Sequence, residues 1–192
     1  MTMTTAPDRT EAAEYYFTYI DQVGAGDIWG VLEAQLVETL ELFNGISDEQ
    51  SLARYAPGKW SIRELLSHVN DTERVFVFRA LWFARGLDSP LPSFDQDIAL
   101  PKAGADERTW RSHVEEFLAV RTATLAFFQN LPADAWMRRG VASGNPVTVR
   151  ALAYISAGHV SHHLKILRER YLSPAPPRSA SSRPDLPLRI TE

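Results

Sequence analysis

Three of the five histidines of this chain lie within six consecutive residues, in the segment Gly158-His159-Val160-Ser161-His162-His163. His159 and His163 are four residues apart, so on an α-helix their imidazoles project from one face and can bind one ion. The same stripe continues with apolar residues, at Leu152, Ile155 and Ile166. The pair is therefore predicted to face the protein interior. His162 is rotated by roughly 60° from this face, so we interpret it as a neighbour of the site rather than a ligand.

His68 lies on the apolar stripe of a second predicted helix, together with Leu65, Thr72 and Val75. Three inward histidines in a chain without cysteine are typical of a divalent-metal site that keeps a fourth position open. The alternative is a set of core histidines that bind no ion. Asp71 follows His68 by about one turn, where its carboxylate could orient an imidazole, although a solvated surface charge explains the spacing equally well.

Two arginines are candidates for binding an anionic group of a substrate. Arg79 is eleven residues after His68, about three turns along the same helix face, and Arg170 is seven residues after His163. The alternative for an inward arginine near a helix end is an ion pair with a carboxylate such as Glu73.

Other polar residues give weaker signals. Asp95 and Asp97 lie in a connection that could reach the open end of the site, but loop acids are usually solvated. His113 lies beside an apolar stripe and is expected to be a half-exposed residue at the edge of the core rather than a fourth ligand. The chain contains no Gly-rich phosphate loop, no G-x-S-x-G elbow and no H-E-x-x-H motif, so nucleotide-dependent, serine-hydrolase and zincin chemistry have no support. No catalytic residue is assigned.

The composition predicts one ordinary globular domain. The chain has 192 residues, of which 45% are hydrophobic and 23% are charged, enough for one core. Its net charge of -4 argues against nucleic acid as the main partner, because phosphates require clustered Lys and Arg. The absence of cysteine excludes disulfides and thiolate ligands. Without a signal-peptide pattern or a membrane-spanning run, we expect a cytoplasmic protein with no membrane contact.

Apolar residues at three- and four-residue spacing predict an all-α protein. Ser61 and Glu64 form a capping box before one of the helices, and Asp27 and Thr148 are candidate N-caps for two others. The expected helices are a short leading one over 10–23 and four long ones over 27–44, 61–85, 106–131 and 148–172. Four such helices with long connections predict a four-helix bundle over residues 1–172. Residues 173–192 are rich in Pro and Ser and are expected to form an extended tail.

Two blocks of the chain resemble the DinB superfamily. The first is Pro57-Gly58-Lys59-Trp60-Ser61-Ile62 leading to His68, and the second runs from Gly158 through His163 to Tyr171. The resemblance implies an up-down-down-up bundle, a divalent ion held by His68, His159 and His163, and a homodimer. Characterised relatives include thiol-dependent transferases and isomerases, and many members have no assigned activity. Val160 departs from the acidic residue expected in close relatives, so no general base is assigned there.

Together these features predict a metal-dependent enzyme, either a transferase that uses a low-molecular-weight thiol or a hydrolase. Because the chain has no cysteine, any thiol would have to come from a small-molecule cosubstrate. Sites made of imidazole ligands have a high affinity for nickel and zinc among the divalent ions, so one of these two ions is expected. Asp71, Arg79 and His162 are the candidates for orienting a ligand or contacting substrate. The alternative is a non-catalytic metal-binding protein of the stress or damage response.

Overall fold

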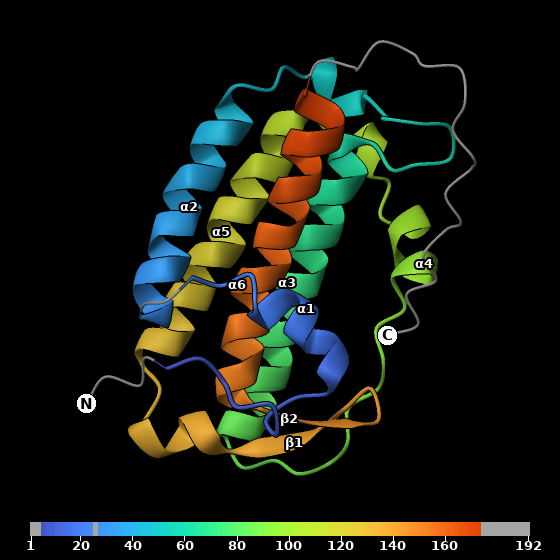
Figure 1. The fold of residues 1–192 in the computed structure, drawn as a ribbon. Helices are drawn as coiled ribbons and strands as arrows, with labels where there is room; N and C mark the ends of the chain where they lie inside the picture. Colours follow the sequence, from blue (N-terminus) through green and yellow to red (C-terminus); the bar gives the residue numbers. More distant parts are fainter. Residues whose placement is uncertain (1–4, 25–26, 174–192) are drawn as a thin grey trace.

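Four long helices form the bundle in the computed structural model, which describes residues 5–24 and 27–173. They are α2 (Ile28–Asn44), α3 (Ile62–Ala84), α5 (Trp110–Gln129) and α6 (Val149–Ile166). Followed along the chain, they run up, down, down and up (Figure 1), which confirms the expected bundle topology. Helix α3 packs on α5 and α6, and α2 packs on the same two helices. The tail predicted over 173–192 lies outside the described residues, apart from Ser173.

Side-chain caps fix where three of the long helices begin. Ser61 Oγ accepts from Glu64 N at 3.0 Å while Ser61 N donates to Glu64 Oε2 at 2.8 Å, so the predicted capping box is confirmed. Thr148 Oγ1 likewise accepts from Ala151 N at 3.0 Å. Asp27 occupies the N-cap position of α2 but makes no side-chain cap hydrogen bond. The third long helix begins at Trp110, later than predicted, because Thr109 caps it and residues 105–107 form a separate turn.

Short elements fill the connections. The leading helix predicted over 10–23 is wrong in length, since only the turn η1 (Glu14–Tyr16) and the one-turn helix α1 (Phe17–Ile20) form. The last long helix continues beyond Ile166 as a π-helical segment, Leu167–Leu172, in agreement with the predicted end. The remaining short helices are η2 (Gln50–Leu52), α4 (Gln96–Ala99), η3 (Leu100–Lys102), η4 (Ala105–Glu107) and η5 (Ala133–Met137).

A two-stranded hairpin connects α5 to α6 and was not predicted. Strands β1 (Arg139–Ala142) and β2 (Asn145–Thr148) are antiparallel, with Ala142 opposite Asn145. The two turn residues, Ser143 and Gly144, have φ angles of 52° and 75°, as required by the tight turns whose twist matches such a hairpin. Four-residue strands are too short to show a clear period-two pattern in the sequence.

Helix α1 lies across α6 (Figure 1), and the glycine at position 158 makes this close approach possible. A Cβ atom built on Gly158 would lie 2.1 Å from the carbonyl oxygen of Tyr19, far inside van der Waals contact. The α1 backbone can therefore rest directly on α6 only where α6 has no side chain. This contact places the Tyr19 ring beside the histidines of α6.

We expect Gly158→Ala to destabilise the protein by about 1–3 kcal/mol, because α1 or α6 must move to admit the methyl group. Urea unfolding measures the change. Gly30→Ala is the matched control, since Gly30 also lies within a long helix but a Cβ there would meet nothing within 4 Å. That control should be neutral or stabilise the helix by up to about 1 kcal/mol. Equal effects of the two substitutions would contradict the proposed close contact.

Two apolar clusters form the core, one toward each end of the bundle. Phe76, Phe83 and Phe128 belong to the cluster beside the hairpin, whereas Leu66 and Phe117 belong to the cluster at the opposite end. Between them each long helix contributes buried polar residues, so a polar layer crosses the bundle. The members of this layer are Gln35, Thr39, His68, Thr72, Glu73, Arg121, Thr124, Ser156, His159 and His163. The predicted ligands therefore belong to a layer that spans all four helices.

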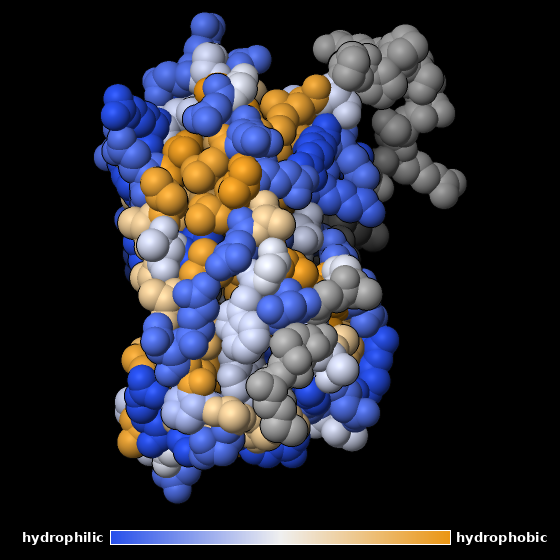
Figure 2. Space-filling view, turned by 90° about the vertical axis from the view of Figure 1, so that its left-hand side faces the viewer, coloured by the Kyte–Doolittle hydropathy of each residue, from blue (hydrophilic) through white to orange (hydrophobic). Residues whose placement is uncertain are grey.

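One face of the bundle carries exposed hydrophobic side chains. Figure 2 shows hydrophobic side chains gathered on the upper part of the face formed by α2 and α5. Val37 and Leu118 are exposed on these helices, while Leu36, Leu40 and Val114 are partly buried against the core cluster beneath. Hydrophobic packing thus continues from the core to the surface here. Among the described residues, no helix combines the length and hydrophobicity needed to cross a bilayer.

Candidate metal centre

The structure brings His68 of α3 together with His159 and His163 of α6. The Nε2 atom of His159 lies 3.1 Å from His68 Nε2 and 3.1 Å from His163 Nε2, so it is the central atom of the group. All three side chains are buried, with His159 only 2% exposed. One nitrogen from each residue falls within 4.8 Å of the others, and within the described part of the chain no carboxylate joins this cluster.

The spacing of these nitrogens fits a divalent ion. Tetrahedral ligands at the usual zinc–imidazole distance of about 2.0–2.1 Å are separated from one another by about 3.3 Å, close to the observed separations. Imidazole nitrogens also suit Zn²⁺ and Ni²⁺. The buried cluster could therefore hold a metal ion, and these residues supply three neutral ligands for it.

Burial keeps the three imidazoles neutral. Loss of solvation lowers the pKa of His68 to about 4, with a smaller contribution from the charge of His162. Burial lowers the pKa values of His159 and His163 well below the ordinary value, and the neighbouring histidines lower them further. Neutral imidazole is the form that binds metals, so at neutral pH the cluster needs to lose no protons before it binds an ion.

The metal-free protein is expected to lose stability as pH falls below about 6.5. In the unfolded chain these histidines titrate near 6.5, whereas burial holds the pKa of folded His68 at about 4. Between those values the unfolded state binds more protons, so acid favours unfolding, and by pH 5 His68 alone accounts for about 2 kcal/mol. Urea unfolding in the presence of a chelator, from pH 8 down to pH 5, measures the slope. A flat profile over this range would contradict the burial of neutral imidazoles.

Aromatic rings surround the cluster on several sides. Tyr19 contacts His159 edge-on with ring centroids 5.3 Å apart, and Phe76 does so at 5.6 Å. The half-buried ring of Trp60 lies 5.0 Å from the His68 ring. These rings shield the imidazoles from bulk water and leave them few ways to rotate.

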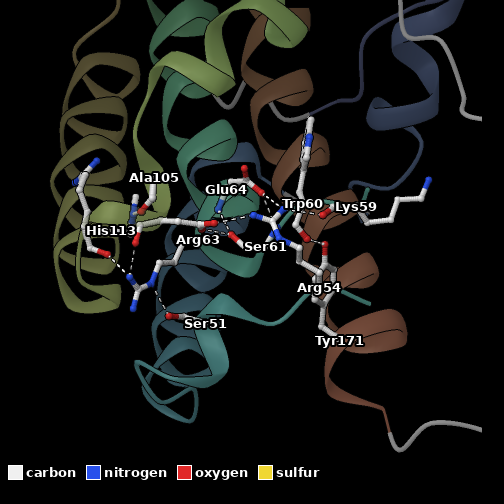
Figure 3. Close-up of polar contacts among 12 residues, drawn as sticks. Ser51, Arg54, Lys59, Trp60, Ser61, Arg63, Glu64, Ala105, His113 and Tyr171 are labelled. Carbon is white, nitrogen blue, oxygen red and sulfur yellow. Dashed lines mark hydrogen bonds and ion pairs between the residues drawn. The ribbon is translucent and has the colours of Figure 1, made fainter. Parts of the chain in front are cut away.

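A polar network holds the segment that carries Trp60 (Figure 3). The Tyr171 hydroxyl donates to the Trp60 carbonyl at 2.7 Å, and Arg54 donates to the Lys59 carbonyl at 2.8 Å and to Glu64. Because Glu64 is also the capping-box residue of α3, one network fixes both the start of that helix and the position of the indole. It therefore sets the packing of Trp60 on His68.

A second part of the network shows what His113 does. His113 Nε2 lies 2.9 Å from the Ala105 carbonyl, and Arg63 nearby donates to Ser51 Oγ at 2.7 Å (Figure 3). His113 lies outside the triad, as expected, but it is fully buried rather than half-exposed at the edge of the core. It therefore ties the connection before α5 to the bundle.

Asp71, Arg79 and His162 were the candidates for orienting a ligand or contacting substrate, and each makes contacts other than those that the helix spacing suggested. Asp71 is half-buried and faces Arg74, with 3.6 Å between their charged atoms, and burial raises its pKa. Arg79 is buried and donates to the Pro92 carbonyl and to Ser143 Oγ, so it braces the hairpin turn instead of meeting a carboxylate. His162 turns toward Tyr19, with ring centroids 5.5 Å apart.

The remaining charged candidates are at the surface. Asp95 caps the short helix α4 by accepting from the backbone N–H groups of Asp97 and Ile98. Both acids are exposed, as is Arg170. None of them belongs to the histidine cluster.

A buried ion pair in the same layer was not predicted. Arg121 of α5 donates twice to the Glu73 carboxylate of α3, both at 2.8 Å, and once to Gln35 Oε1 of α2 at 2.7 Å. Gln35 Nε2 in turn donates to the Ala157 carbonyl of α6 at 2.8 Å and to Ser161 Oγ at 2.9 Å. All four helices are thereby linked, and the contacts on α6 flank His159. The sequence did contain a signal for this pair, because Glu73 and Arg121 are charged residues within otherwise apolar helix stripes.

A cavity of about 530 Å³ lies beside α1, away from the histidine cluster. Phe17, Ile20 and Tyr154 line it together with residues of the N-terminal segment. No member of the triad contributes to its wall.

Comparison with solved structures supports the fold. The bundle resembles YfiT from Bacillus subtilis, described as a probable metal-dependent hydrolase with an unusual four-helix bundle topology. The two chains are 15% identical, with a TM-score of 0.61, and the match covers 85% of this chain and 92% of YfiT. At this identity the likeness shows the fold alone. The chain has no significant match among curated protein sequences.

The family follows from the sequence profile. Residues 32–167, more than half of the chain, match the DinB superfamily, and the protein belongs to that superfamily. It is thus a DinB protein that contains a buried triad of histidines.

Proposed function

We propose that this protein is a metal-dependent enzyme that binds one divalent ion, zinc or nickel, through His68, His159 and His163. The observation that carries the proposal is the convergence of three buried, neutral imidazole nitrogens on one point. Within the described residues no fourth protein ligand joins them. Structural zinc sites are usually closed by four protein ligands, whereas catalytic sites use three.

When bound, a divalent ion at this site would supply Lewis acidity, which lowers the pKa of a water or thiol that reaches the fourth position. The residues of the chain have the complementary tasks. The imidazoles are neutral and leave the positive charge of the ion intact, while the rings of Tyr19 and Phe76 keep bulk water from His159. Trp60, beside His68, would form a wall for the bound small molecule.

Two reactions fit this arrangement, hydrolysis and transfer of a small thiol. Hydrolysis is supported by the description of YfiT, which shares the fold. Thiol transfer is supported by the resemblance to thiol-dependent relatives, and the absence of cysteine means that the thiol must be a cosubstrate. In both reactions a nucleophile of low molecular weight attacks an electrophilic substrate.

The experiment offers metal-loaded protein a panel of esters and amides, and a panel of small thiols together with an electrophile. We expect turnover in one panel that disappears after chelation and returns when the ion is restored. The His68→Ala protein should be inactive in the same assay. Arg111→Ala is the control, because Arg111 lies exposed on α5 and pairs with Glu115 on the same helix.

Two results would overturn the proposal. Turnover that survives chelation would show that the triad is not its source. Stoichiometric metal binding without turnover in any panel would favour the non-catalytic alternative, in which the ion braces α3 against α6.

A further inference from the structure

Thr72 links the two helices that carry the triad. It lies one turn after His68 on α3 and is 1% exposed. Its Oγ1 atom is 2.7 Å from the His68 carbonyl oxygen, 3.2 Å from the Val69 carbonyl oxygen and 3.3 Å from His159 Nδ1. The same oxygen atom therefore contacts the backbone of one predicted ligand, His68, and the ring of another, His159.

The hydroxyl has one proton, and its neighbours decide where that proton goes. A carbonyl oxygen can only accept, so the shortest contact, to the His68 carbonyl, takes the Thr72 proton. The lone pairs of Oγ1 are then left to face His159 Nδ1, which must donate. A neutral imidazole has one N–H, so a proton on Nδ1 leaves Nε2 of His159 with a free lone pair.

The freed atom is the one that the site needs. His159 Nε2 is the central nitrogen of the triad, 3.1 Å from its two counterparts. The ring of His163 is not held in this way, because within the described chain its Nδ1 atom is buried with no hydrogen-bond partner. Thr72 therefore orients the ring on which the geometry of the cluster depends.

We propose that Thr72 is a positioning residue, which holds His159 in the tautomer with Nδ1 protonated and Nε2 directed at the ion. Its effect on metal affinity rests on the proposed function. The tautomer itself is a property of the metal-free protein and can be measured without any ion. Asp71, which the helix spacing suggested for this role, faces Arg74 instead.

The competing explanation is that the Thr72 hydroxyl merely satisfies a helix carbonyl. Thr124 on α5 allows the two explanations to be separated. It is also 1% exposed, and its Oγ1 donates to the Val120 carbonyl at 3.0 Å, whereas no hydrogen bond from Thr124 to a histidine is found among the described residues. Substitution of either threonine by valine keeps the shape of the side chain and removes the hydroxyl.

Nitrogen-15 NMR of the histidine rings in metal-free protein at about pH 8, where neutral imidazole predominates, reports the tautomer. We expect His159 to be protonated at Nδ1 in the native protein and in Thr72→Ser, and to lose this preference in Thr72→Val. Zinc affinity, measured by competition with a chelator, should fall about 10- to 100-fold in Thr72→Val and recover in Thr72→Ser. Thr124→Val should change neither the tautomer nor the affinity.

The native protein alone provides a decisive test if Thr72→Val does not fold. A spectrum with His159 protonated at Nε2 would overturn the proposal without any variant. The proposal would also be overturned if Thr72→Val kept the native tautomer, or if Thr124→Val altered it equally. Failure of the native protein to bind zinc would refute the proposed function while the tautomer measurement still tested Thr72.

Discussion

The His159→Ala protein is expected to be purified with less than about a tenth of the divalent ion found in the native protein, which should contain about one ion per chain. His159 supplies the central nitrogen, 3.1 Å from both other predicted ligands. Removal of one of three imidazoles leaves two neutral donors on different helices, too few for a stable site. Elemental analysis of protein that has been loaded and then dialysed measures the occupancy.

His162→Ala is the matched control for this substitution. His162 is in the same turn of α6 and its ring is 5.1 Å from that of His163, yet it lies outside the cluster of convergent nitrogens. This variant should keep its ion. Loss of the ion from both variants, or from neither, would show that the triad is assigned wrongly.

Helix periodicity made the triad accessible to sequence reasoning. Each histidine lies on an apolar stripe, and a bundle buries such stripes, so inward direction could be predicted for each one separately. Their convergence at one level of the bundle depends on how far α3 is displaced along its axis relative to α6. That displacement is set by packing between helices, which periodicity does not encode.

Residues that act through tertiary contacts could not be predicted in the same way. Thr72 reads as an ordinary stripe position, and only the approach of α6 brings His159 Nδ1 to its hydroxyl. The short leading helix was overestimated because its periodic pattern extends beyond the α-helix formed by residues 17–20. Its position against α6 depends on the small size of Gly158 rather than on any pattern.

The buried ion pair between Arg121 and Glu73 has the largest predicted effect on stability. Both side chains are almost completely buried, and the carboxylate receives two hydrogen bonds from the guanidinium at 2.8 Å. Glu73→Gln removes the negative charge and leaves the buried Arg121 guanidinium facing neutral acceptors, the introduced amide oxygen and Gln35 Oε1. We expect a loss of about 3–5 kcal/mol, measured by urea unfolding of the metal-free protein.

Replacement of the whole pair should cost much less than removal of one partner. The double variant Glu73→Met, Arg121→Met removes both charges of this buried pair, so its stability should approach or exceed that of the native protein. Glu38→Gln is the surface control, because Glu38 pairs with Arg168 in an exposed position, and its loss should cost at most about 1 kcal/mol. If Glu73→Gln cost as little stability as Glu38→Gln, water would have to reach Arg121. The polar layer would then not be the dry contact between helices that its hydrogen bonds indicate.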